Sequence, residues 1–116
     1  MRVEAMTWTD VCAVDAIPLE GGVAALVGGE AVAVFRTHSG EVFAIGNVDP
    51  FSGASVLSRG IVGSRGDLPV VSSPMFKQAF DLTTGRCLDD DRASVAAYDV
   101  SVVDGLVLVG SRREPT

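Results

Sequence analysis

The sequence predicts an all-β domain built as an antiparallel β-sandwich or barrel. About nine short runs of strand-forming residues recur, with turn signals roughly every eight to twelve residues. No window holds an apolar stripe at helical spacing that is long enough for a regular helix. Two pairs of runs are joined by dipeptides typical of tight hairpins, Gly28-Gly29 and Asp104-Gly105.

The first half of the chain is expected to form an edge strand and then a three-stranded meander. The edge strand covers residues 7–11, and a break at Pro18 and Gly21-Gly22 follows it. The meander strands are expected at residues 23–27, 31–36 and 42–45. The turn at residues 28–30 contains two glycines, which can take the positive φ values that such turns demand.

The second half is expected to contain two hairpins with one short strand between them. Its strands are predicted at residues 61–63, 69–71, 79–82, 98–102 and 106–109, with a short helical turn within residues 54–60. Gly85 suits a left-handed turn position after residue 82. We therefore expect one domain, residues 1–116, with a loop-rich subdomain at about residues 46–82 inserted in the sandwich.

Two loops, residues 47–53 and 72–77, hold the most specific pattern in the chain. The first contains Asp49-Pro50-Phe51, and the second contains Ser73-Pro74-Met75-Phe76. The turn Phe80-Asp81-Leu82-Thr83-Thr84-Gly85 follows. This array resembles the cluster-binding region of a Rieske domain, which has Cys-Pro-His, Cys-Pro-x-His and Phe-Asp-x-x-Thr-Gly. The resemblance implies a Rieske-like fold whose four ligand positions are vacated and hold Asp49, Phe51, Ser73 and Phe76.

Residue counts argue against an iron–sulfur cluster without any alignment. A Rieske [2Fe-2S] centre needs two thiolates on one iron and two imidazoles on the other. The chain has a single histidine, His38, and two cysteines, Cys12 and Cys87. A benzyl side chain at Phe51 or Phe76 has no lone pair to donate. We therefore expect no iron, no metal site and no bound cofactor in this chain.

Charge and hydropathy limit the partners. The net charge is −6 and the isoelectric point is about 4.5, so phosphate backbones and anionic lipid surfaces would be repelled. Nucleic acid and membranes are therefore poor candidates, whereas a mean hydropathy of +0.36 suggests a buried partner face. The first residues lack the apolar core of a signal peptide, and we expect a cytoplasmic protein. A reducing compartment favours two free thiols over a disulfide between Cys12 and Cys87, although the sequence leaves both states open.

The residues at the vacated positions leave two arrangements open. Phe51 and Phe76 could pack against each other and close the tip, or one or both rings could stay exposed as an anchor for another protein. Asp49 and Ser73 are expected to form turn-stabilising hydrogen bonds. Arg59 and Lys77, beside the loops, could pair with an acidic partner surface, although single exposed charges contribute little.

Two other sets of polar residues are expected to be structural. His38 lies in a predicted turn and is expected to be exposed, without the orienting partner that catalysis requires. Asp89, Asp90 and Asp91 lack the alternating spacing and the final glutamate of a calcium loop. We expect them to form a solvated acidic turn.

Residues 47–63 and 73–78 resemble, more closely than a general Rieske likeness, the small subunit of the assimilatory NAD(P)H-dependent nitrite reductase. The resemblance implies a non-catalytic partner of a large subunit that carries FAD, an iron–sulfur centre and sirohaem, in an enzyme that reduces nitrite to ammonium during nitrate assimilation. Two other classes of function remain open. One is an electron carrier of the Rieske ferredoxin type, and the other is a free-standing β ligand-binding module, which a deep polar pocket away from the loops would favour.

Overall fold

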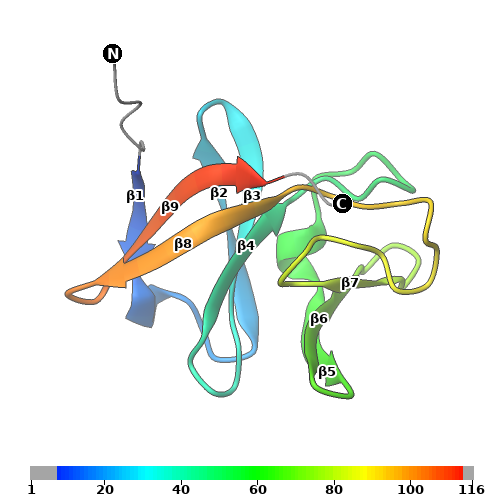
Figure 1. Ribbon diagram of the computed structural model, residues 1–116, viewed down its shortest axis with the longest axis horizontal. Coiled ribbons are helices and arrows are strands. Elements are labelled where there is room, and N and C mark those ends of the chain that lie inside the picture. Colours follow the sequence, from blue (N-terminus) through cyan, green and yellow to red (C-terminus); the bar gives the residue numbers. More distant parts are fainter. Residues whose placement is uncertain (1–7, 114–116) are drawn as a thin grey trace, which may run out of the picture.

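The computed structural model describes residues 8–113 and has nine strands in two antiparallel sheets within that range (Figure 1). The larger sheet has six strands in the order β1-β9-β8-β4-β3-β2. Its strands are β1 (Thr9–Ala13), β2 (Gly21–Val27), β3 (Glu30–Arg36), β4 (Val42–Gly46), β8 (Ala97–Val103) and β9 (Leu106–Arg113). The predicted all-β fold is therefore confirmed.

The smaller sheet has the order β5-β6-β7 and lies in the chain between β4 and β8. Its strands are β5 (Ile61–Arg65), β6 (Leu68–Ser72) and β7 (Ala79–Asp81). The short helical turn expected within residues 54–60 is the 3-10 helix η2 (Leu57–Arg59), which leads into β5. A second 3-10 helix, η1 (Val14–Ala16), was not expected from the sequence.

Most expected strands are present with slightly longer bounds. The first strand was predicted from Thr7, which lies outside the described residues, and the observed β1 runs on to Ala13. Gly28 and Gly29 form the two-residue turn between β2 and β3 with φ values of 59° and 82°. At the β8–β9 turn, Asp104 and Gly105 also have positive φ, as the hairpin signal predicts.

Strand β3 separates two apolar cores. Successive side chains of a strand point to opposite faces, so Ala33 and Phe35 face one core while Val32 and Val34 face the other. The first core joins the larger sheet to the smaller one through Leu57, Val71 and Phe80, among others. The second core lies on the other side of β3 and includes Val107 and Val109 of β9. The continuous apolar run of β3 thus reflects burial on both faces.

The first loop connects β4 to η2 and projects at the end of the molecule opposite to the β8–β9 turn (Figure 1). The second loop connects β6 to β7. Both loops therefore begin where a strand of one of the two sheets ends.

Candidate functional site

The first loop is organised around the buried side chain of Asp49, which has no exposed surface. Its Oδ1 accepts a hydrogen bond of 2.7 Å from the backbone N–H of Phe51. The backbone of Asp49 closes the loop further, because its N–H donates to the Ala54 carbonyl and its carbonyl accepts from Gly53. The expected turn-forming role of Asp49 is confirmed.

Asn47, which the sequence reasoning did not single out, holds the base of the same loop. Its side-chain amide donates to Ser55 Oγ at 2.8 Å, and its Oδ1 accepts from the Ser58 N–H at 2.7 Å. Asn47 is 2% exposed, so these bonds lie inside the structure. An asparagine at the end of an apolar strand was the signal available in the sequence, because its side chain often bonds to nearby backbone groups.

The second loop is built in a similar way around Ser73, which is 1% exposed. The Ser73 N–H donates to the Gln78 carbonyl, and the Ser73 carbonyl accepts from Lys77, both at 2.9 Å. Ser73 Oγ also accepts from the Met75 N–H at 3.2 Å. Lys77 has a φ of 65°, a left-handed conformation that reverses the chain before β7.

The two loops are joined by a direct side-chain hydrogen bond. The Ser73 hydroxyl donates to Oδ2 of Asp49, across 24 residues of sequence. These two positions correspond to the cysteines of the Rieske pattern. The sequence predicts a turn-forming role for each residue, but it does not predict that the two side chains contact each other.

The side chains at the other two vacated positions, Phe51 and Phe76, lie in different environments. Phe51 is half-buried against the first core, and its ring lies 6.3 Å from that of Phe80, centroid to centroid. Phe76 is 57% exposed. Of the two arrangements that the sequence leaves open, the structure favours the one with an exposed ring, because Phe76 is exposed while Phe51 packs against Phe80. The Phe80 ring is fully buried beneath the first loop and offers Phe51 more apolar contact than an exposed partner would.

The loops expose a largely apolar tip. We use the term tip surface for the exposed residues Val48, Pro50, Pro74, Met75, Phe76 and Lys77. Val48, Met75 and Phe76 are 43%, 47% and 57% exposed, respectively. Arg59 is also exposed, at the end of η2.

His38 lies away from the tip surface. It is exposed in the turn between β3 and β4, as expected, beside a cavity of about 100 Å³ that Glu20, Glu41 and Asp67 also line. Among residues 8–113, no group of three or more His, Cys, Asp or Glu side chains is arranged to hold a metal ion.

The acidic turn is only partly solvated, which corrects the expectation for Asp89. The Asp89 carboxylate accepts hydrogen bonds from Arg65, at 3.0 Å, and from the backbone N–H of Ala79, at 2.8 Å. These bonds lower the pKa of Asp89, the Arg65 bond contributing most. Asp90 forms an ion pair with Arg92, whose hydrogen bond lowers the pKa of Asp90. Asp89 therefore ties this segment to the smaller sheet.

The residues of the tip do not fit a [2Fe-2S] cluster. Asp49 and Ser73 bond to each other, and the rings of Phe51 and Phe76 point to different surroundings without a donor atom. The two cysteines cannot replace the missing donors, because Cys87 lies in the first core and Cys12 packs against the second. Both cysteines are free.

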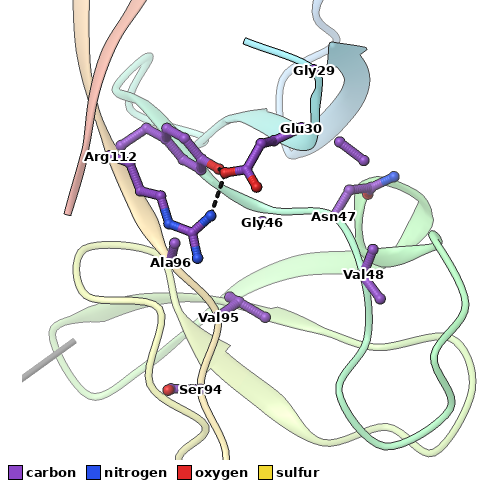
Figure 2. A pocket seen from close by; sticks show the side chains of 11 residues that line it. Gly29, Glu30, Gly46, Asn47, Val48, Ser94, Val95, Ala96 and Arg112 are labelled. Atoms are coloured by element: carbon purple, nitrogen blue, oxygen red, sulfur yellow. Dashed lines mark hydrogen bonds and ion pairs between the residues drawn. The ribbon is translucent and has the colours of Figure 1, made fainter. Parts of the chain in front are cut away.

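A cavity of about 420 Å³ lies beside the start of the first loop (Figure 2). Figure 2 shows the Arg112 guanidinium and the Glu30 carboxylate facing each other at this cavity, and the two groups form an ion pair. The hydrogen bond from Arg112 lowers the pKa of Glu30, and the Tyr98 hydroxyl also bonds to that carboxylate at 3.2 Å. The charged side chains that line the cavity, Glu30 and Arg112, are thus paired with each other. The rest of its lining is Gly29, Ala31, Gly46, Asn47, Val48, Ser94, Val95 and Ala96.

The two helices between residues 8 and 113 are single 3-10 turns, and neither has the length and apolar character needed to cross a membrane.

Comparison with known proteins assigns the family. The family model described as a Rieske-like [2Fe-2S] domain matches residues 7–110. The NADH nitrite reductase small subunit of Escherichia coli K12 is 48% identical over 101 residues, which cover 86% of this chain and 94% of that protein. A region of the NAD(P)H nitrite reductase large subunit of Klebsiella oxytoca is 41% identical over 106 residues, covering 91% of this chain but 11% of that protein.

Solved structures agree with this assignment. The structure of an NADH-dependent nitrite reductase small subunit from Mycobacterium tuberculosis has a TM-score of 0.89 and 49% identity, covering 93% of this chain and 97% of that one. The ferredoxin of carbazole 1,9a-dioxygenase from Nocardioides aromaticivorans has a TM-score of 0.77 and 27% identity, covering 95% and 99%. The chain therefore belongs to the Rieske-like family of nitrite reductase small subunits.

Proposed function

We propose that this chain is the non-catalytic small subunit of a cytoplasmic NAD(P)H-dependent nitrite reductase, which reduces nitrite to ammonium in nitrate assimilation. The observation that carries the proposal is the 48% identity to the Escherichia coli NADH nitrite reductase small subunit, along 94% of that protein. A match over 86% of this chain and 94% of that protein supports a shared role rather than a shared structural element alone.

The proposed partner is the large subunit of the same enzyme, which would carry the FAD, the iron–sulfur centre and the sirohaem. The Klebsiella oxytoca relative supports this partner, because a homologous region lies within a protein named as a large subunit. Covalent linkage gives two binding modules a high effective concentration. A separate small subunit would reach the same arrangement through a binding interface.

The side chains of the tip favour a non-catalytic role for this chain. The Ser73 hydroxyl donates a hydrogen bond to Asp49, and no histidine lies in either loop to activate the hydroxyl as a nucleophile. The aromatic rings at the remaining two positions can pack but cannot bind iron or transfer a proton. The protein would therefore act through contacts with the large subunit.

Genetic deletion and complementation would test this function. We expect a strain that lacks the gene to grow poorly with nitrite as sole nitrogen source, and the tagged protein to co-purify with a sirohaem-containing large subunit. Growth at the parental rate, together with no co-purifying large subunit, would overturn the proposal. Complementation with the intact gene controls for effects on neighbouring genes.

An electron-carrier function is the rival that a specific observation favours, namely the similarity to the dioxygenase ferredoxin. Anaerobic incubation with iron and sulfide distinguishes the two functions. We expect no stoichiometric iron or sulfide and no visible absorption, whereas a Rieske ferredoxin treated in parallel should acquire both. A cluster with an EPR signal that appears on reduction would favour the electron carrier.

A further inference from the structure

We propose that the tip surface is the docking site for the nitrite reductase large subunit, and that the partner presents an apolar pocket for Phe76 with a carboxylate near Lys77. This inference rests on the proposed function and names the surface that would bind the large subunit.

The two joined loops expose apolar side chains. Met75 and Phe76 on the second loop and Val48 on the first are each more than two-fifths exposed. The Asp49–Ser73 hydrogen bond joins the two loops that carry these residues. Aromatic residues and methionine are enriched in the desolvated centre of protein interfaces, so this composition suits a docking surface.

Backbone hydrogen bonds hold both loops in an ordered conformation. The backbone of the second loop is closed by the bonds Ser73 N–H to Gln78 O and Lys77 N–H to Ser73 O. The first loop is closed by Asp49 with Ala54 and Gly53. Binding costs less conformational entropy when the contacting loops are already ordered. The exposed side chains of Met75 and Phe76 therefore extend from a backbone that is already ordered before binding.

The exposed charged residues of the two loops and η2 are cationic, although the chain as a whole is acidic. In a chain of net charge −6, the segments 47–60 and 72–77 contain one carboxylate, Asp49, which is fully buried. Their other charges are the exposed Lys77 and Arg59. The tip surface and the adjoining η2 therefore carry exposed cations and no exposed carboxylate, on an otherwise acidic protein. Complementary potentials direct encounter and fix register, so the partner face should be acidic around an apolar centre.

The nearby acidic segment does not cancel this pattern. Asp89 pairs with Arg65 and Asp90 pairs with Arg92, so two of its three carboxylates are matched by cations within the chain.

The four residues expected to dock divide into different roles. Phe76 is the anchor, because its ring is exposed on a rigid loop, and Lys77 supplies the adjacent charge. Phe51 supports the tip from within through its packing on Phe80 and is not itself an anchor. Arg59 is exposed at the end of η2, outside the tip surface as defined, and a single exposed charge contributes little to affinity.

Binding to the purified large subunit, measured by calorimetry, would test the docking site. We expect Phe76→Ala to raise the Kd about 30-fold, as loss of a central aromatic anchor does. Lys77→Glu should raise it about tenfold at low salt and less at high salt, because like charges would then face each other. The matched control is Val103→Ala. Val103 is 50% exposed next to the β8–β9 turn, at the end of the molecule opposite to the first loop (Figure 1), and its truncation should change the Kd less than twofold.

The outcomes separate the docking surface from the proposed function. If the wild-type chain binds but Phe76→Ala and Lys77→Glu bind equally well, the docking surface is wrong and the function stands. If the wild-type chain does not bind the large subunit at all, the proposed function itself fails. Thermal unfolding of each variant confirms that it is folded.

A second measurement needs no substitution. In a cross-saturation NMR experiment on the labelled small subunit with unlabelled large subunit, we expect the strongest signal loss at residues 48–53 and 74–77. Strongest loss at the β8–β9 turn would overturn the proposed surface.

Discussion

The Ser73 hydroxyl donates a hydrogen bond to the buried carboxylate of Asp49, at the two positions where the Rieske pattern has cysteines. In a Rieske domain the cluster links the two loops. In this protein a hydrogen bond between two side chains links them instead. Phe51 adds to it by packing on Phe80 in the adjoining core. The resulting tip keeps two loops together while leaving Phe76 exposed.

Removing either partner of this hydrogen bond should destabilise the fold. Asp49→Ala leaves the Phe51 N–H and the Ser73 hydroxyl without their acceptor and should lower the free energy of unfolding by about 3 kcal/mol. Ser73→Ala should lower it by about 2 kcal/mol, because a buried carboxylate loses a donor. Urea denaturation measures both changes.

A double-mutant cycle tests whether the two side chains act together. The Asp49→Ala, Ser73→Ala double variant should lose less than the sum of the single variants, with a coupling of about 1–2 kcal/mol. Ser64→Ala, at an exposed position of β5, is the matched serine control and should change stability by less than about 0.5 kcal/mol. Strict additivity would show that the bond does not link the loops energetically.

The two phenylalanines at the former histidine positions should differ sharply in their contribution to stability. Phe51→Ala removes a half-buried ring from contact with Phe80 and should cost about 2 kcal/mol. Phe76→Ala should change stability by less than about 0.5 kcal/mol, because the ring is 57% exposed. Equal losses in urea denaturation would contradict the packing described here.

Gly85 should tolerate no side chain. It has a φ of +83°, and an added Cβ would lie 2.0 Å from the Val95 carbonyl oxygen, which is backbone and cannot rotate away. We expect Gly85→Ala to cost about 3–5 kcal/mol, combining left-handed strain with overpacking. Gly53→Ala is the control, because Gly53 has a φ of +74° but no atom near an added Cβ, so about 1–2 kcal/mol of strain alone is expected. Thermal unfolding of the two variants gives the comparison.

Acid should weaken the attachment of the Asp89 segment to the smaller sheet. The folded state lowers the pKa of Asp89 below its ordinary value of 3.8 through the Arg65 and Ala79 hydrogen bonds. A lowered folded-state pKa contributes stability above the unfolded pKa, and this contribution is lost as the pH falls through the folded value. Wild-type stability should therefore decline below about pH 4.

Asp89→Asn isolates this contribution. It should lower the free energy of unfolding at pH 7 by about 0.5–1 kcal/mol, since the segment is exposed and its ion pair is screened. Its stability should fall less steeply than that of the wild type below about pH 4. Parallel pH profiles for the two proteins would assign the acid sensitivity to other carboxylates.

Local signals were sufficient for most of the secondary structure. Alternating or continuous apolar runs, Gly28-Gly29 and Asp104-Gly105 marked strands and turns close to their observed places. The helix η1 was missed, because three residues without an apolar period leave no pattern to detect. The roles of Asn47 and Asp89 were missed because their partners in the chain are brought to them by the fold.

The sequence by itself determined the all-β fold and the absence of the Rieske ligand set, since the spacing of apolar residues and the residue composition are properties of the chain alone. Only the tertiary structure decided how the four substituted positions are used. It bonded Asp49 to Ser73, turned Phe51 toward Phe80 and left Phe76 exposed. The physical reason is that a side chain's partner depends on which apolar surface and which donor the fold brings within contact distance, and residue identity cannot specify that by itself.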